Sequence, residues 1–188
     1  MGVCRTGKLL SSDYLGPDRK PGLITLGKSI TGGVYPASYI LGDDDIMSVV
    51  GARELVFTYA FSPLAIAATR AALQVVEVER LSERARELEE VFLHQSKERK
   101  WADHSFVHYI TARGAEFRIY LTEGNEILCR RIGMLCMDKG LLLFPKDLYL
   151  RMSSTLVIGR EEFGRAMDIL GEAMEKCLEE DHAYKARL

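Results

Sequence analysis

One stretch of sequence decides the fold, residues 26–36, which read Leu-Gly-Lys-Ser-Ile-Thr-Gly-Gly-Val-Tyr-Pro. The apolar run just before it, Leu23 to Leu26, predicts a short, fully buried strand, so Lys28 is expected at a strand end. Three glycines around this lysine leave room for a bulky planar group to approach the backbone. A lysine held there would be partly desolvated, which favours the neutral amine that attacks aldehydes. The alternative is a surface lysine in a glycine-rich turn.

The regions on either side of this stretch predict a loop and a short helix. Residues 1–22 hold several glycines and prolines, which favours loop with at most one helical turn. Residues 34–41 have the composition of a strand. The following Gly-Asp-Asp-Asp run, residues 42–45, would cap a helix that begins near Ile46.

A single long helix is predicted from Ser62 to Lys100. Ser62 is a good cap, and Pro63 falls in the first turn, where its missing N–H costs nothing. Apolar residues are dense from 64 to 76, whereas charged residues dominate after 78. The first half is therefore expected to be buried and the second half to be a solvated linker that crosses to another domain.

The rest of the chain predicts an α+β layer. Two strands that alternate around Arg113 and Gly114 form an expected hairpin, and Gly140 is expected to end a helix. The predicted strands are residues 106–111, 116–121, 141–144 and 148–152, and the predicted helices are 125–139 and 160–179. Residues 181–188 are expected to fray.

Composition and net charge exclude some classes of protein function. The 188 residues are 47% hydrophobic with a net charge of −2, which predicts a soluble globular protein and argues against a nucleic-acid partner. No apolar run is long enough to span a membrane, and the first residues lack the core of a signal peptide. The cytoplasm is the predicted compartment, with the mitochondrial matrix as the alternative. Four dispersed cysteines predict buried, reduced thiols, and neither they nor the four histidines suggest a metal site.

Residues 26–36, followed by Asp-Asp-Asp-Ile-Met at 43–47, resemble the segment around the cofactor-binding lysine of ornithine aminotransferases, which are class III aminotransferases dependent on pyridoxal 5′-phosphate (PLP). Further similarities follow in the same order along the chain. They are Arg-Thr-Gly at 5–7, Thr-Tyr at 58–59 with Ser-Pro-Leu at 62–64, Gly-Leu-Leu at 140–142, Arg151, and Leu-Val-Ile at 156–158.

The resemblance implies roles for three residues. Lys28 would bind PLP covalently and later move a proton between the substrate carbon and the cofactor. Thr58 would reach the cofactor phosphate of a neighbouring subunit, since the family is dimeric; otherwise it is an ordinary loop residue. Arg151 would grip the substrate α-carboxylate through its planar guanidinium. From the residues alone, Arg130 and Arg131 are no worse candidates than Arg151 for that task.

Some positions depart from the family pattern. Ala60, Phe61 and Ser62 replace a Gly-Gly-Asn run, and Phe61 adds bulk where the family keeps the backbone close to the cofactor. Residues 152–155, Met-Ser-Ser-Thr, replace Phe-Ala-Pro-Pro, and Gly22 stands where the family usually has aspartate. In the family, the pyridine-binding aspartate, the glycine-rich phosphate loop and the aromatic residue stacked on the cofactor all precede the segment that corresponds to Met1.

These observations predict an α/β fold, namely part of the PLP-transferase type I fold. Residues 1–75 would form the tail of the large PLP-binding domain, with a parallel or mixed sheet, and residues 76–188 the linker helix and the small C-terminal α+β domain. The implied activity is transfer of an amino group from ornithine or another ω-amino acid to a 2-oxo acid, by a homodimer or with a complementing chain. The chain is expected to be truncated, and to be inactive or incomplete on its own. The alternative is a non-catalytic remnant that acts as a binding or dimerisation subunit.

Overall fold

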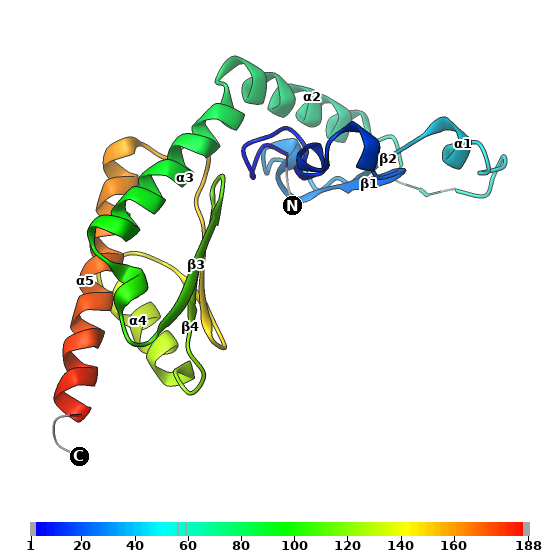
Figure 1. Ribbon diagram of the computed structural model, residues 1–188. Helices are drawn as coiled ribbons and strands as arrows, with labels where there is room; N and C mark the ends of the chain where they lie inside the picture. The colour runs from blue at the N-terminus through cyan, green and yellow to red at the C-terminus, as the bar shows by residue number, and fades with distance from the viewer. Residues whose placement is uncertain (1–2, 56, 59, 186–188) are drawn as a thin grey trace. The chain divides into compact units, whose positions relative to one another are not determined.

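The computed structural model describes residues 3–55, 57–58 and 60–185 of the chain (Figure 1). The chain divides into two compact units, Met1–Ala85 and Arg86–Leu188. Each unit has its own small sheet, of two strands in the first and four in the second. All strand pairings among the described residues are antiparallel.

The first unit is built around a two-stranded ribbon. Its elements are η1 (Ser11–Leu15), η2 (Pro17–Arg19), β1 (Leu23–Leu26), η3 (Lys28–Thr31), β2 (Tyr39–Gly42), α1 (Asp44–Met47) and α2 (Pro63–Val78). The strand predicted at residues 23–26 is confirmed, but its full burial is wrong, because exposed and half-buried positions alternate along β1. Among the described residues β1 pairs with β2 alone, and a two-stranded ribbon cannot enclose its own faces.

Two glycines of the ribbon make room for the side chains of α1. A Cβ at Gly22 would lie 2.5 Å from Cδ1 of Ile46, and a Cβ at Gly42 would lie 2.7 Å from Cγ and Sδ of Met47. Both distances are too short for real atoms. Glycine at position 22, where the resemblance leads one to expect aspartate, therefore allows Ile46 its present position.

The predicted long helix is two helices. Ser62 caps α2 by accepting a hydrogen bond from the backbone N–H of Ala65, as expected. However, α2 ends at Val78, and α3 (Leu81–Glu98) begins after Arg80, whose φ of 50° lies in the left-handed region. The predicted burial of the first half is also wrong, because Ala65 is the only buried residue of α2 among those described. Within the described residues, no helix combines the length and the apolar content that crossing a bilayer requires.

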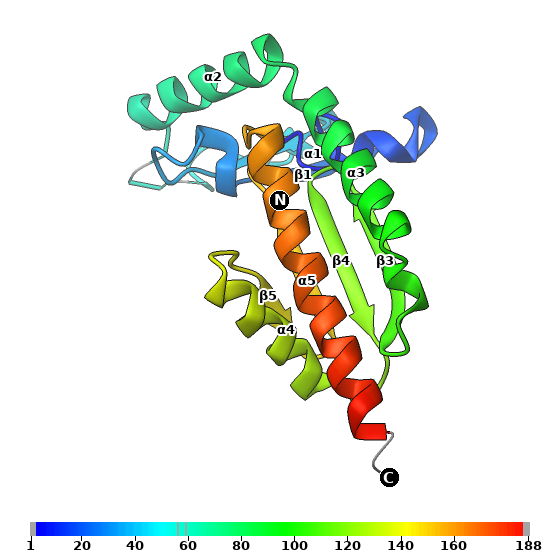
Figure 2. The same cartoon turned by 90° about the vertical axis from the view of Figure 1, so that its left-hand side faces the viewer.

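The second unit is a four-stranded antiparallel sheet with helices on one face (Figures 1 and 2). The strand order is β3-β4-β6-β5, and helix α5 lies between α3 and α4. The elements are η4 (Trp101–Asp103), β3 (Val107–Arg113), β4 (Glu116–Leu121), α4 (Glu126–Asp138), β5 (Phe144–Lys146), β6 (Tyr149–Ser153) and α5 (Arg160–Lys185). The predicted hairpin and both helices are confirmed, and α5 continues six residues beyond the predicted end, so the part of the tail up to Lys185 is helical rather than frayed.

The core of the second unit forms between the inner face of the sheet and the helices. The ring of Phe92 stacks on that of Phe117 with centroids 4.5 Å apart, and Trp101 is fully buried beside them. All four cysteines are buried and free, as predicted. Burial raises the pKa of the Cys129 and Cys177 thiols to about 11 and that of Cys136 to about 12, because a thiolate would lose its hydration there.

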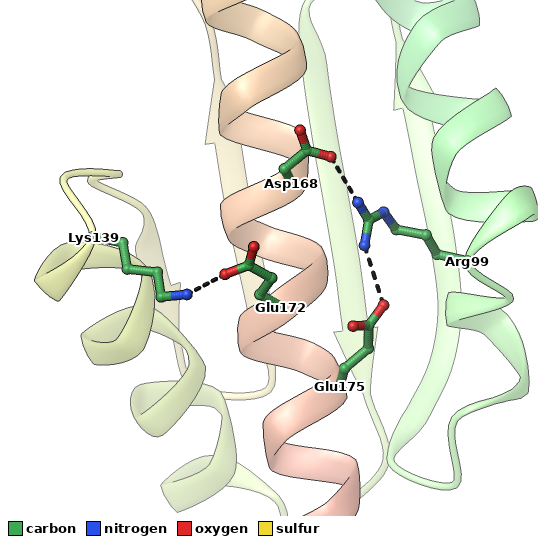
Figure 3. A network of polar contacts seen from close by, with 5 residues as sticks. All are labelled: Arg99, Lys139, Asp168, Glu172 and Glu175. Carbon is green, nitrogen blue, oxygen red and sulfur yellow. Dashed lines mark hydrogen bonds and ion pairs between the residues drawn. The ribbon is translucent and has the colours of Figure 1, made fainter.

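Ion pairs fasten helix α5 to the ends of α3 and α4 (Figure 3). The guanidinium of Arg99 donates to Asp168 at 2.6 Å and to Glu175 at 3.1 Å. On the other side of α5, Lys139 pairs with Glu172 and lowers the pKa of that carboxyl. Arg99 lies against Gly171, where a Cβ would come within 2.5 Å of its guanidinium. Glycine at this position of α5 thus leaves the space that Arg99 fills.

Candidate functional site

Lys28 lies in a tight turn directly after β1. Gly27 has an extended backbone, and the helical turn η3 begins at Lys28. The φ of Lys28 is 55°, in the left-handed region that costs a residue with a side chain about 1 kcal/mol. Six other non-glycine residues of the described chain also have a positive φ, so this conformation identifies a constrained turn at Lys28 and does not by itself mark a functional site.

The turn is held by the residues that follow Lys28. Ile30 and Thr31 are 2% and 1% exposed, and the Thr31 hydroxyl donates to the carbonyl of Tyr35. The N–H of Gly32 donates to the carbonyl of Ser29 at 3.0 Å. These contacts fix the backbone on which Lys28 sits. Lys28 itself is exposed, so the desolvation expected from the sequence is not supplied by the described residues of its unit.

The space around the turn lies beside Gly33. A Cβ at Gly33 would have no heavy atom within 4 Å, whereas at Gly27 it would meet backbone and side chain at ordinary distances of 3.8 and 3.9 Å. An exposed lysine in a turn that also contains an open glycine is compatible with the approach of a planar aldehyde such as PLP. A separate pocket of about 300 Å³ lies on β1, but its lining comes from Val3, residues 9–12, Pro21 and residues 23–26, and Lys28 does not take part.

Thr58 lies in an exposed turn of the first unit. The turn is closed by a hydrogen bond of 3.0 Å from the N–H of Ala60 to the carbonyl of Phe57. Tyr59, which the resemblance pairs with Thr58, lies outside the described residues. Phe61 has a φ of 58° and is 89% exposed, so its ring does not occupy space inside this unit. Thr58 itself is exposed, which is compatible with binding a phosphate.

Arg151 lies on β6, on the face of the sheet that the helices leave uncovered. Its Nε and NH2 groups donate to both carboxylate oxygens of Glu116 at 3.2–3.3 Å. Glu116 is 5% exposed and also accepts a hydrogen bond of 2.6 Å from the hydroxyl of Ser153. A carboxylate of the protein thus already occupies the guanidinium edge that would bind a ligand carboxylate.

Lys28 and Thr58 belong to the first unit and Arg151 to the second. The two alternatives to Arg151 lie on α4, where Arg130 is exposed and Arg131 pairs with Glu180 at 3.1 Å. Neither is on the sheet face that carries Arg151. Among the described residues, no three His, Cys, Asp or Glu side chains are placed to hold a metal ion.

Sequence reasoning missed Glu116, Ser153 and Arg118. The signal was present, because Glu116 and Arg118 alternate with the apolar residues of a predicted strand and must share its polar face. What the sequence does not contain is the register that sets Arg118 opposite Arg151 and Glu116 opposite Ser153.

Comparison with known proteins identifies the family. Residues 1–174 match the family model described as aminotransferase class III. This chain belongs to the class III aminotransferases. The match includes Lys28, Thr58 and Arg151, and the family is PLP-dependent.

Several relatives of the chain are ornithine aminotransferases. That of Emericella nidulans is 34% identical over 176 residues, which cover 92% of this chain and 38% of the relative. The structure of the Toxoplasma gondii enzyme, which holds PLP at partial occupancy in its active site, superposes with a TM-score of 0.88 at 28% identity, over 96% of this chain and 42% of that one. Ornithine delta-aminotransferase of Plasmodium falciparum superposes with a TM-score of 0.84 at 32% identity, over 95% and 44%.

These matches confirm the predicted fold class, part of a PLP-dependent aminotransferase fold. The chain spans about two-fifths of the length of the relatives that it matches. The described strands differ from the expectation in one respect, since they pair only in antiparallel fashion.

Proposed function

We propose that this chain is the C-terminal part of a PLP-dependent aminotransferase that transfers an amino group from ornithine or another ω-amino acid to a 2-oxo acid. The observation that carries the proposal is Lys28, a lysine in left-handed backbone at the end of β1 and within the family match. Residues 1–75 would belong to the large PLP-binding domain and residues 76–188 to the linker helix and the small domain. Residues outside this 188-residue stretch would complete the active site.

Each candidate residue would have a separate task. PLP, when bound, withdraws electrons from the substrate and so makes the proton on its amine-bearing carbon removable. Lys28 Nζ would hold the cofactor and, as the free amine, move the proton between the amine-bearing carbon of the substrate and the cofactor. We also propose a homodimer, in which the Thr58 hydroxyl would donate to the cofactor phosphate of the neighbouring subunit. The Arg151 guanidinium would hold the substrate carboxylate. The exposure of Lys28 and the open space at Gly33 in the same turn support this assignment.

The test is covalent capture of PLP. The chain is incubated with PLP and reduced with borohydride, and the peptides are analysed by mass spectrometry. The added mass is expected on the peptide that contains Lys28, and Lys28→Ala should abolish it. Lys20→Ala is the matched control, because Lys20 is an exposed lysine of the same unit whose partner is Asp43. Equal labelling of Lys20 and Lys28 would show non-specific chemistry and would contradict the proposal.

A second candidate function is a non-catalytic binding or dimerisation subunit. The observation in its favour is the apolar surface of α2 and the loop before it, where many large side chains are exposed. They are Phe57, Phe61, Leu64, Ile66, Leu73, Val75 and Val78. A surface of this kind is typical of a site that another protein covers. If PLP is never captured at Lys28, with or without the rest of an aminotransferase, while the chain still forms a complex, this second function holds.

A further inference from the structure

The uncovered face of the sheet in the second unit brings two arginines directly opposite each other. Arg118 on β4 and Arg151 on β6 are cross-strand partners, so their side chains leave the sheet side by side. Like charges in this arrangement repel each other unless an anion lies between them. The pair therefore marks a place on the sheet where negative charge is favoured.

Glu116 is the negatively charged residue beside this pair, and its carboxylate contacts Arg151 much more closely than Arg118. Its carboxylate makes three contacts of 3.2–3.3 Å with Arg151 but approaches Arg118 only to 3.9 Å. Ser153 holds the same carboxylate from the other side, and the Glu116 side chain is 4% exposed. Glu116 is thus fixed on Arg151 and cannot serve both cations equally.

The guanidinium N–H groups of Arg118 remain available as hydrogen-bond donors. Within the described part of the chain its guanidinium makes no hydrogen bond, and its one ion pair is the distant one to Glu116. The Arg118 side chain is 34% exposed, so it is restrained by the sheet yet open to solvent on one side. A planar guanidinium in this state can bind a carboxylate through two parallel hydrogen bonds.

We infer that Arg118 is a carboxylate-binding residue of this site and that an incoming carboxylate meets Arg118 before Arg151. The charge of Arg151 is already neutralised by Glu116, so the stronger attraction comes from Arg118. The next pair on the same face is Tyr120 and Tyr149, with ring centroids 5.3 Å apart, which provides an apolar wall for the carbon chain of the ligand. The ligand class, an amino acid or a 2-oxo acid, rests on the proposed function.

The test is a titration of the full chain, without PLP, with butyrate as the probe. Backbone amide and arginine Nε–H shifts are followed by NMR at constant ionic strength. A saturable shift is expected on β4 and β6, and Arg118→Gln should weaken binding about ten-fold or more, the loss expected from one charged hydrogen-bond pair. Arg118→Lys, which keeps the charge and loses the planar donors, should retain part of the affinity. Arg130→Gln on the exposed side of α4 removes the same charge and should change nothing.

Two results would overturn the inference. One is the absence of any saturable shift with butyrate. The other is unchanged affinity in Arg118→Gln together with loss of binding in Arg151→Gln, which would make Arg151 the sole receptor. Capture of PLP at Lys28 is read from the other unit and does not depend on either outcome, so failure of this inference and failure of the proposed function are told apart.

Discussion

The contact between Arg99 and Gly171 permits a quantitative test of how helix α5 is held in the second unit. Replacing a helical glycine by alanine normally stabilises a helix by about 1 kcal/mol. At Gly171, however, the new Cβ would lie 2.5–2.9 Å from three atoms of Arg99, so the guanidinium must leave its place. Arg99 would then lose its ion pairs with Asp168 and Glu175, together with the packing of its side chain, which is only 24% exposed.

The size of the effect follows from these contacts. The two carboxylates are 59% and 50% exposed, so each ion pair contributes up to about 1 kcal/mol. The lost contacts of about 1–2 kcal/mol offset or exceed the gain in helix propensity. Gly171→Ala is therefore expected to be neutral or destabilising by up to about 1 kcal/mol. In an Arg99→Ala background the same change should stabilise by about 1 kcal/mol.

The assay is urea unfolding followed by tryptophan fluorescence. Trp101 is the only tryptophan of the chain and is fully buried in the second unit, so its emission reports the unfolding of that unit. Gly164→Ala is the matched control, because Gly164 also lies on α5 and a Cβ there meets nothing within 4 Å. It should stabilise by about 1 kcal/mol whether or not Arg99 is present. If Gly171→Ala stabilises the protein with Arg99 intact as much as Gly164→Ala does, the reasoning is refuted.

Three other predictions concern the buried thiols, the Lys28 turn and the Arg151 ion pair. The thiols of the unfolded chain lose their protons at about pH 8.5, whereas burial raises the pKa of Cys129, Cys136 and Cys177 in the folded chain to about 11 or 12. The contribution of these thiols to the unfolding free energy should therefore be constant below about pH 8 and fall as pH rises from about 9 to 11. An unchanged urea midpoint between about pH 9 and 11 would contradict this. Lys28→Gly should be about 1 kcal/mol more stable than Lys28→Ala, because the positive φ at this position strains alanine and not glycine. The difference is measured as slower amide exchange of the Gly32 N–H, which closes the turn, in the glycine variant. Equal exchange rates in the two variants would argue against backbone strain. Arg151→Ala should destabilise the second unit by about 2 kcal/mol, because it leaves the buried carboxylate of Glu116 without its main partner. Adding Glu116→Ala to this variant should restore part of the lost stability, as measured by urea unfolding. If the losses of the two single variants simply add, the pair is not coupled.

The elements of the second unit could be predicted from sequence to within a few residues. The alternation of apolar and polar residues in 106–121, the Arg113-Gly114 turn and Gly140 are local features with local consequences, and the structure has the hairpin and helix that they indicate. The first unit was predicted less well. The break at Arg80 has no glycine or proline to announce it, and the apolar residues of α2 look the same in sequence whether or not another layer covers them.

The residues of the candidate site also differ in how far the sequence could predict them. The residues of the Lys28 turn are adjacent along the chain, so the sequence alone located Lys28 and, through its motif, the aminotransferase family. The pairing of strands β4 and β6 joins residues that are 29 to 37 positions apart, and no local pattern specifies which of them meet. Only the tertiary structure could set Arg118 beside Arg151 and place the buried carboxylate of Glu116 against one of them. The reason is that a one-residue change in strand register would turn every one of these side chains to the other face of the sheet.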